Sequence, residues 1–262
     1  GGKDSLALWD LLVELGYDAD GLYLGLGIDG YSDESATRAQ AFADRIGRTL
    51  IAIDLPSDLG YDIPEGSRAA KRAPCSACGI SKRHLFDQAA LEGGYDVVVT
   101  GHNLDDEAAV LFCNVLVWQA DYLGRQWPVL PARSGFPRKA KPLVRLYERE
   151  MAAYCILRGI DYQIEECPMS DGNRHTAYKE ALNDIEVQSP GSKFAFYFGF
   201  LARGAERFRP EADAGRDDLL PCVSCGAPTP TEICAFCRLV ERAGGRLPVP
   251  SGPVPVELGL PT

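Results

Sequence analysis

The sequence predicts an α/β fold in which a parallel β-sheet is covered by helices on both faces. Three apolar segments typical of buried strands, residues 21–29, 49–55 and 95–100, alternate with segments whose apolar residues have helical spacing. Strands that alternate with helices pair in parallel, and their connections cross the sheet in the right-handed sense. We therefore expect a ligand site at the carboxyl ends of these strands, where open α/β sheets bind their ligands.

The helices are predicted from their apolar periodicity. They cover residues 6–15, 32–46, 80–92, 105–118, 147–158, 176–186 and 192–203. Ser32 is a typical N-cap residue for the second of these helices. Cys75 and Cys78 fall in a polar stretch that we expect to be a loop. Residues 124–142, which contain Pro and Gly, are expected to separate the sheet from the later helices, and residues 162–165 to form a short strand.

The chain begins with a segment suited to binding phosphate, Gly1-Gly2-Lys3-Asp4-Ser5, which leads into a helix. Glycines let backbone N–H groups converge on phosphate oxygens, and the start of a helix adds positive potential. Lys3 supplies a mobile charge and Ser5 a hydroxyl group. The spacing is not that of a Walker loop, and a plain tight turn is the alternative for these five residues alone. Because the chain starts inside this loop, we expect the strand that leads into it to lie upstream of Gly1.

A second strand-to-helix turn carries polar residues within VVVTGHNLDDE, residues 97–107. Gly101 permits a close backbone approach, and Asp105 and Asp106 lie at the start of a helix. Acidic residues at this position commonly cap the helix, which we expect of one of the two. The other could hold a magnesium ion beside bound phosphates.

The charge balance limits the kinds of partner. A net charge of −10 argues against a protein that holds nucleic acid by charge alone. A local basic face is predicted at residues 133–149, with a solvated loop as the alternative. Its charged residues are Arg133, Arg138, Lys139, Lys141, Arg145 and Arg149 against Glu148. No apolar run approaches the roughly 18 residues that span a bilayer, so we expect no membrane association and a cytoplasmic location.

The nine cysteines are grouped in a way that indicates metal binding. The CxxC pairs are Cys75 with Cys78, Cys222 with Cys225, and Cys234 with Cys237. Paired CxxC motifs in a cytosol-like composition point to metal rather than to disulfides. The last two pairs predict a closed tetrahedral zinc site that stabilises a segment too short for its own core. Cys113 and Cys155 fall within apolar helices, where we expect them to be buried and inert.

Three parts of the chain are expected from these patterns. Residues 1–203 form the catalytic domain, and residues 204–240 form a linker and the zinc module. Residues 241–262 form a Pro-rich tail, which we expect to be extended or disordered from Arg246 on.

The two polar turns, GGKDS at 1–5 and GHNLDDEA at 101–108, together resemble the PP-loop ATP-pyrophosphatase superfamily. Its members split ATP between the α- and β-phosphates to adenylate a substrate. Further motifs are PCSACGISKR (74–83), KPLVRLYERE (141–150), Glu166-Cys167-Pro168, YKEALN (178–183) and SPGSKF (189–194). This series resembles the tRNA 2-thiolation branch, especially the 2-thiouridine synthetases that act on the T-loop. The similarity covers residues 1 to about 240, and the family usually carries another zinc module before the PP-loop.

The resemblance implies a [4Fe–4S] cluster held by Cys75, Cys78 and Cys167, with one iron open to hydrosulfide. Soft thiolates suit such a cluster. Two alternatives remain open for these cysteines: a structural zinc site completed by a histidine, and persulfide and disulfide chemistry without a cluster. The candidate histidines are His84, His102 and His175.

The resemblance also implies a site for ATP and Mg²⁺. Its residues are Gly1, Gly2, Lys3, Asp4, Ser5, Lys82, Gly101 and Asp106. Asp4 and Asp106 would help to place magnesium, and Lys82 matches a family position that contacts ATP. From the residues alone, Lys82 is equally a lysine on a helix surface. The implied catalytic residues are Cys75, Cys78, Cys167, Lys82 and Asp106.

The implied reaction replaces the C2 oxygen of a tRNA uridine by sulfur. The uridine oxygen attacks the α-phosphorus, pyrophosphate leaves, and sulfide then displaces AMP at C2. The implied partners are tRNA, a small ubiquitin-like carrier with a thiocarboxylate end, and a second copy of the chain. Two alternatives stay open: a PP-loop enzyme that forms an amide or lysidine-type bond without a cluster, and an inactive module that binds ATP and zinc.

Overall fold

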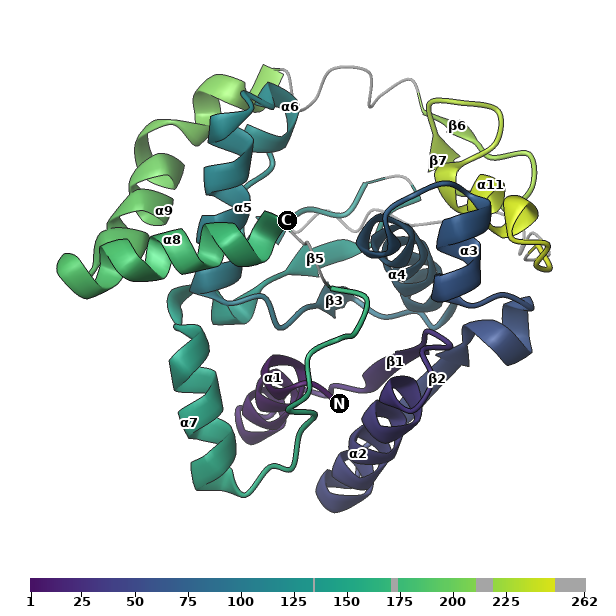
Figure 1. The fold of residues 1–262 in the computed structure, drawn as a ribbon, viewed down its shortest axis with the longest axis horizontal. Coiled ribbons are helices and arrows are strands. Elements are labelled where there is room, and N and C mark those ends of the chain that lie inside the picture. Colours follow the sequence, from purple (N-terminus) through teal and green to yellow (C-terminus); the bar gives the residue numbers. More distant parts are fainter. Residues whose placement is uncertain (134, 171–173, 211–218, 248–262) are drawn as a thin grey trace, which may run out of the picture.

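The computed structural model describes residues 1–133, 135–170, 174–210 and 219–247, and its centre is formed by parallel strands (Figure 1). Strand β1 (Gly21–Gly25) pairs in parallel with β2 (Leu50–Asp54). Strand β3 (Val97–Val99) pairs in parallel with β5 (Arg138–Ala140), and β4 (Val129–Leu130) lies antiparallel on the far side of β5. The parallel pairing confirms the α/β fold class. Within the described residues, β1–β2 and β3–β5–β4 form separate sheets.

Helices lie on both sides of these strands. The α-helices are α1 (Lys3–Glu14), α2 (Tyr31–Ile46), α3 (Ile63–Ala69), α4 (Pro74–Glu92), α5 (Leu104–Leu116), α6 (Ala120–Leu123), α7 (Glu148–Arg158), α8 (Arg174–Gln188), α9 (Ser192–Arg203) and α11 (Ala235–Arg242), with short turns η1 (Leu55–Leu59), η2 (Pro142–Arg145) and η3 (Ala205–Phe208). Helices α1 and α2 lie on one side of the strands, and α3 and α4 lie on the other (Figure 1). Among the described helices, none combines the length and apolar character needed to cross a membrane.

Buried side chains connect these layers. Leu85 of α4 and Phe236 of α11 belong to one core that also contains residues of β1 and η1. Trp9 of α1 and Met151 of α7 belong to a second core, which continues onto α2. Tyr197 of α9 is fully buried in a third core with residues of α5. The first core joins the C-terminal cysteine module to the helix that carries Cys75 and Cys78.

Helix α4 begins earlier than the apolar periodicity predicted. Pro74 occupies its first helical position, where the missing N–H costs no hydrogen bond and the fixed φ favours a helix start. Cys75 and Cys78 therefore lie at the start of a helix, and the prediction of a loop at these cysteines was wrong.

The start of α2 also differs from the prediction. Its N-cap residue is Gly30, and Ser32 lies inside the first turn. The hydroxyl oxygen of Ser32 accepts a hydrogen bond from the N–H of Ile28 at 3.1 Å. Ser32 thus stabilises the turn between β1 and α2 rather than capping the helix.

The sheet extends into residues 124–142, which the sequence had indicated only as a separating stretch. These residues contain β4 and β5, and β5 was missed because its Arg-Lys-Ala sequence is polar. Conversely, residues 162–165 do not form the predicted strand. They contribute a single parallel bridge, between Gln163 and Gly2.

The C-terminal module consists of the antiparallel strands β6 (Leu220–Pro221) and β7 (Pro228–Thr229), followed by α11. Helix α11 packs against α3 and α4. Residues 211–218 of the expected linker, and residues 248–262 of the expected tail, lie outside the described residues.

Candidate active site

The glycine-lysine loop at residues 1–5 is held against a distant segment of the chain. Gly2 is the N-cap of α1 and forms the parallel bridge with Gln163. The N–H of Gln163 donates to the carbonyl oxygen of Gly1 at 2.8 Å, and the Gln163 side chain accepts a hydrogen bond from Arg38 at 2.8 Å. A Cβ added at Gly2 would meet no atom within 4 Å. The loop is therefore anchored along one side and open on the other, as a loop that receives phosphate requires.

Gly101 brings the second polar turn into contact with this loop. A Cβ at Gly101 would lie 2.8 Å from the carbonyl carbon and oxygen of Asp4 and 2.9 Å from the nitrogen of Ser5. Only glycine permits so close an approach of two backbones. The side-chain amide of Asn103 also donates to the Asp4 carboxylate at 3.1 Å. The two turns thus lie side by side, as the parallel-sheet argument predicted.

Charged side chains of alternating sign form a chain beside the loop. The ammonium group of Lys3 lies 3.1 Å from Asp4 and 2.6 Å from one oxygen of Glu148. The other oxygen of Glu148 lies 3.1 Å from the ammonium group of Lys179, which contacts Asp106 at 2.5 Å. Helices α1, α5, α7 and α8 each contribute at least one of these residues.

The pKa values of these groups reflect partial burial and close pairing. For Lys3 and Lys179, burial acts to lower the pKa, but the carboxylates next to them outweigh it and raise the pKa. For Glu148, burial acts to raise the pKa, but the two lysines outweigh it and lower the pKa. Burial raises the pKa of Asp4, with the nearby charge of Asp106 acting in the same direction. The charged forms of Lys3, Lys179 and Glu148 are thereby favoured.

Asp105 and Asp106 have different surroundings. Asp106 forms a capping box with Asn103, in which each side chain accepts a hydrogen bond from the other residue's N–H at 3.1 Å. Asp105 is buried, contacts the buried ammonium group of Lys193, and accepts a hydrogen bond from the N–H of Glu148 at 2.8 Å. Asp106 is therefore both the capping acid and the acid that pairs with Lys179. The expected division, with one acid capping the helix and the other free for a ligand, is not observed.

Cys75, Cys78 and Cys167 are brought together from two distant segments. Burial raises the pKa of the Cys78 thiol; Lys82 acts to lower it, and the charges of Cys167 and Cys75 act to raise it. Cys78 and Cys167 pack against the same core, whereas Cys75 is exposed and donates to the carbonyl oxygen of Met169 at 3.7 Å. The group is therefore accessible from solvent on one side.

Lys82 of α4 lies near both the loop and the cysteine group. It is close enough to act electrostatically on the nitrogen of Gly1, as Arg38 does, and on the thiol of Cys78.

The three candidate histidines contact residues other than Cys75, Cys78 and Cys167. His84 stacks on Phe236, His102 hydrogen bonds to Thr100 at 2.7 Å, and His175 lies edge-on to a tyrosine ring. Within the described ranges, no group of three cysteines and a histidine has all its ligand atoms within 4.8 Å of one another. This geometry does not favour the alternative of a zinc ion completed by a histidine.

Comparison with known proteins places this arrangement in a family. The chain is 50% identical over 240 residues to a Thermus thermophilus protein named tRNA-5-methyluridine(54) 2-sulfurtransferase, a match that covers 91% of this chain and 74% of that protein. The chain belongs to the tRNA 2-thiolation sulfurtransferase family. A Pyrococcus horikoshii protein of the same name is 40% identical over 238 residues, covering 91% of this chain and 75% of the relative. No protein-family model matches the chain.

A solved structure of the same family has the same fold. It is the U34-tRNA thiolase NcsA from Methanococcus maripaludis with its [4Fe-4S] cluster, which superposes with a TM-score of 0.76 at 26% identity and covers 96% of this chain and 81% of that one. The predicted PP-loop thiolase fold and the enzyme class, a tRNA sulfurtransferase, are confirmed. This family membership favours thiolation over the amide- or lysidine-forming alternative and over an inactive module.

The C-terminal module of this sulfurtransferase forms a compact four-cysteine group. The sulfur atoms of Cys222, Cys225, Cys234 and Cys237 all lie within 4.8 Å of one another. A tetrahedral zinc ion with Zn–S bonds of about 2.3 Å needs sulfurs about 3.8 Å apart, and those of Cys225 and Cys234 are 3.7 Å apart. The N–H of Cys234 also donates to the sulfur of Cys222 at 3.2 Å. This donor set fits a closed zinc site.

The two remaining cysteines differ in burial. Cys155 is fully buried, as predicted, whereas Cys113 is only half-buried. The thiol of Cys155 donates to the carbonyl oxygen of Lys3 at 3.5 Å, directly behind the loop. Burial, followed by the charge of Asp4, raises the pKa of Cys155 to about 11, which keeps this thiol protonated.

Most cations of the predicted basic face at residues 133–149 already contact acidic or aromatic side chains of the sulfurtransferase itself. Lys139 and Lys141 form ion pairs with Asp87 at 2.6 Å and with the buried Glu107 at 2.7 Å. Arg145 and Arg149 lie over aromatic rings of α9 and of Tyr147. These contacts do not support a continuous face of free cations.

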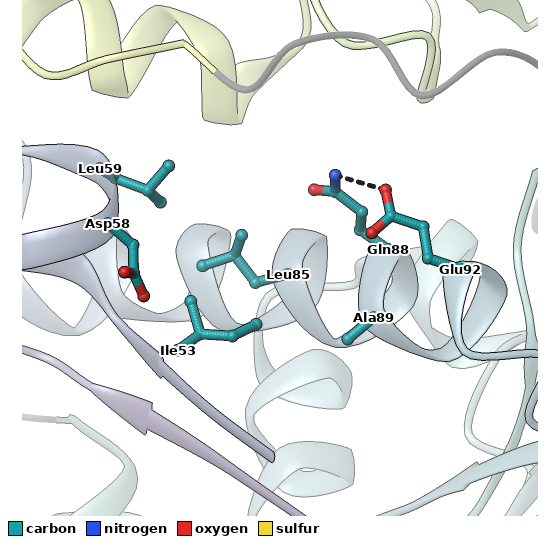
Figure 2. Close-up of a pocket in the computed structure, with 7 residues that line it drawn as sticks. All are labelled: Ile53, Asp58, Leu59, Leu85, Gln88, Ala89 and Glu92. Carbon is teal, nitrogen blue, oxygen red and sulfur yellow. Dashed lines mark hydrogen bonds between the residues drawn. The ribbon is translucent and has the colours of Figure 1, made fainter.

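A separate cleft of about 190 Å³ lies at the other end of α4 (Figure 2). It is lined by Ile53, Asp58, Leu59, Leu85, Gln88, Ala89 and Glu92. Its floor is apolar, and Gln88 and Glu92 hydrogen bond to each other at 2.9 Å on one wall. None of these residues belongs to the loop or the cysteine group, so the cleft is not part of the sulfurtransferase site.

Sequence reasoning did not single out Glu148, Lys179, Asn103 or Gln163. Glu148 and Lys179 lie within two of the motifs that carried the resemblance, KPLVRLYERE and YKEALN, which is the signal that could have identified them. Gln163 had no such signal, since its contact with the loop depends on how the chain returns to α1.

Proposed function

We propose that this chain is an ATP-dependent tRNA uridine 2-thiolase that adenylates the C2 oxygen before it transfers sulfur. The observation that carries the proposal is the close approach of Gly101 to Asp4 and Ser5, which joins the two polar turns that would bind the nucleotide. Lys82 lies near both Gly1 of this loop and Cys78 of the cysteine group. A nucleotide on the loop and sulfur near the cysteines would then meet at one uridine. The family thiolates tRNA, so tRNA is the substrate.

The loop is proposed to bind the phosphates of ATP. Gly2, where a Cβ would meet no atom within 4 Å, is the N-cap of α1, and its N–H and that of Gly1 are the proposed phosphate donors. Lys3 and Ser5 supply a charge and a hydroxyl group. The carboxylates of Asp4 and Asp106 lie close enough to interact electrostatically, and their oxygen atoms are suited to bind Mg²⁺.

The chemistry has two displacements. In the first, the uridine O2 attacks the α-phosphorus, and the bond from that phosphorus to the bridging oxygen of pyrophosphate breaks. Charge accumulates on the phosphate oxygens, where Lys3, Lys82 and Mg²⁺ would offset it. In the second, a sulfide donor attacks C2 and AMP leaves with the former uridine oxygen. No net oxidation or reduction occurs.

The cysteine group is proposed to hold a [4Fe–4S] cluster, the cofactor named for the NcsA structure. Cys75, Cys78 and Cys167 provide three soft ligands, and the group is open to solvent at Cys75. When bound, such a cluster supplies an iron with a free coordination position for sulfide. The charge of Lys82 acts to lower the pKa of the Cys78 thiol, against the larger effect of burial, and so favours the thiolate that metal binding requires.

Further parts of the proposal concern features outside the loop and the cysteine group of Cys75, Cys78 and Cys167. We expect Zn²⁺ in the four-cysteine module, a small ubiquitin-like carrier with a thiocarboxylate end as the sulfur donor, a homodimer, and a cytoplasmic location. Residues 1–203 would form the catalytic domain and residues 204–240 the linker and zinc module.

The proposal is tested on the protein with any natural sequence that precedes Gly1, purified without oxygen. Iron, labile sulfide and zinc are measured per chain in the wild type and in Cys167→Ala. We expect about four irons in the wild type, and their loss in the variant while zinc stays. With tRNA, Mg-ATP and sulfide, only the wild type should form 2-thiouridine, with one AMP and one pyrophosphate per thiolated base. Thiolation without AMP formation would refute the adenylation step, and a metal content unchanged by the substitution would refute the cluster ligands.

A further inference from the structure

We propose that Lys179 is a second phosphate-binding cation of the ATP loop, and that Glu148 holds Lys179 and Lys3 in place until the nucleotide arrives. The inference rests on the proposed binding of ATP to the loop and adds two residues to it. The proposed function assigns neither residue.

The geometry links both lysines to one carboxylate. Lys3 and Lys179 contact different oxygens of Glu148, at 2.6 Å and 3.1 Å, so their ammonium groups are close neighbours. Lys3 begins the helix that follows the glycines, and Lys179 reaches the same place from α8. A phosphate group bound by the loop would therefore have a cation on two sides.

The charge balance explains why phosphate oxygens would have to replace Glu148 as the partner of Lys3 and Lys179. Within this chain of ion pairs, three carboxylates (Asp4, Asp106 and Glu148) face two ammonium groups, which leaves one excess negative charge. Lys82 and Arg38, near Gly1, would attract a triphosphate, but these three carboxylates would repel it. Mg²⁺ on Asp4 and Asp106 would reverse the balance and remove one partner of Lys179. The phosphate oxygens could then replace Glu148 as the acceptor for both lysines.

The backbone supports such an exchange without rearrangement. Glu148 is the first residue of α7, and its N–H is fixed by the buried Asp105 at 2.8 Å. Its side chain is 38% exposed and can turn into solvent. Lys179 lies on a helix that packs against α5, and its four-carbon side chain can redirect the ammonium group by rotation alone.

Binding to a nucleotide analogue tests the assignment directly. Isothermal titration calorimetry measures the affinity for Mg-α,β-methylene-ATP, which cannot release pyrophosphate, and for AMP. Lys179→Met removes the charge and keeps most of the side chain, and Glu148→Gln removes the competing carboxylate. We expect Lys179→Met to weaken analogue binding roughly 10- to 100-fold, the usual effect of losing a hydrogen bond to a charged group, and to change AMP binding less than about twofold. Glu148→Gln should bind the analogue at least as tightly as the wild type.

The matched control is Lys139→Met, which removes a lysine of similar exposure whose partner, Asp87, lies outside the loop. This control should bind both ligands like the wild type. Lys179→Arg keeps the charge and should recover most of the analogue affinity. Lys179→Gln, which also removes the charge, replaces the methionine variant if that variant does not fold.

The possible results distinguish a failure of the roles of Lys179 and Glu148 from a failure of the proposed ATP site. Wild-type affinity for the analogue in Lys179→Met, or an equal loss for the analogue and AMP, would overturn the role of Lys179. Weaker binding of the analogue by Glu148→Gln would overturn the role of Glu148. Failure of the wild type itself to bind the analogue would refute the proposed ATP site, and the inference with it.

Discussion

The contact between Gly101 and the loop makes Gly101→Ala the sharpest test of the site. The added methyl group would lie 2.8 Å from the backbone carbon and oxygen of Asp4 and 2.9 Å from the nitrogen of Ser5. Real Cβ atoms do not approach other atoms within 3.0 Å. Backbone atoms, unlike the end of a flexible side chain, cannot rotate away, so the two turns must separate by several tenths of an ångström.

The expected cost can be estimated from two opposing effects. Overpacking of this kind costs about 1–3 kcal/mol, and alanine returns about 0.4–1 kcal/mol by restricting the unfolded chain. We therefore expect Gly101→Ala to lower the free energy of unfolding by up to about 2.6 kcal/mol. The affinity for Mg-α,β-methylene-ATP should fall at the same time, because Asp4 and Ser5 are displaced within the loop.

Urea denaturation measures the first effect and calorimetry the second. The matched control is Gly199→Ala in α9, where a Cβ would meet no atom within 4 Å. This variant should gain about 0.5–1 kcal/mol, as expected for alanine in a helix interior. A Gly101→Ala protein with wild-type stability and affinity would refute the close approach of the two turns.

Three further predictions address the core, the buried ion pair and the cysteines. Phe236→Ala, which empties a fully buried ring site under α4, should lower the free energy of unfolding by about 3–5 kcal/mol; an effect below about 1 kcal/mol in urea denaturation would show that the module does not share the core. Lys193→Met should cost about 3–5 kcal/mol, because it leaves the Asp105 carboxylate buried without its cation, and substituting both residues by apolar ones should recover part of this loss. Near pH 8.5, about the ordinary thiol pKa, iodoacetamide should label the exposed Cys75 far faster than Cys155 in metal-free protein. The reason is that burial raises the pKa of Cys155 to about 11 and keeps its thiol protonated. Equal labelling rates of the two cysteines, measured by mass spectrometry, would contradict this assignment.

Local patterns in the sequence were sufficient for much of the fold. Apolar periodicity located β1, β2 and β3 and most of the helices, because a buried face requires apolar residues at the spacing of a strand or a helix. It failed at β5, whose Arg138 and Lys139 are polar, and at the start of α4, where Pro74 rather than an apolar residue begins the helix. Both elements are fixed by neighbours that are distant in sequence or by backbone geometry, which periodicity does not record.

The site divides in the same way. By itself, the sequence determined the chemical groups: the glycine-lysine loop, the cysteine pairs and the four-cysteine module, whose spacing is set by local geometry. Only the tertiary structure placed Glu148 and Lys179 beside Lys3, and Phe236 under α4. Ion pairs and packing join residues from different helices, and which pairs meet depends on how the helices cross the sheet. That arrangement depends on the packing free energy of the whole core, and no short segment of the sequence determines it.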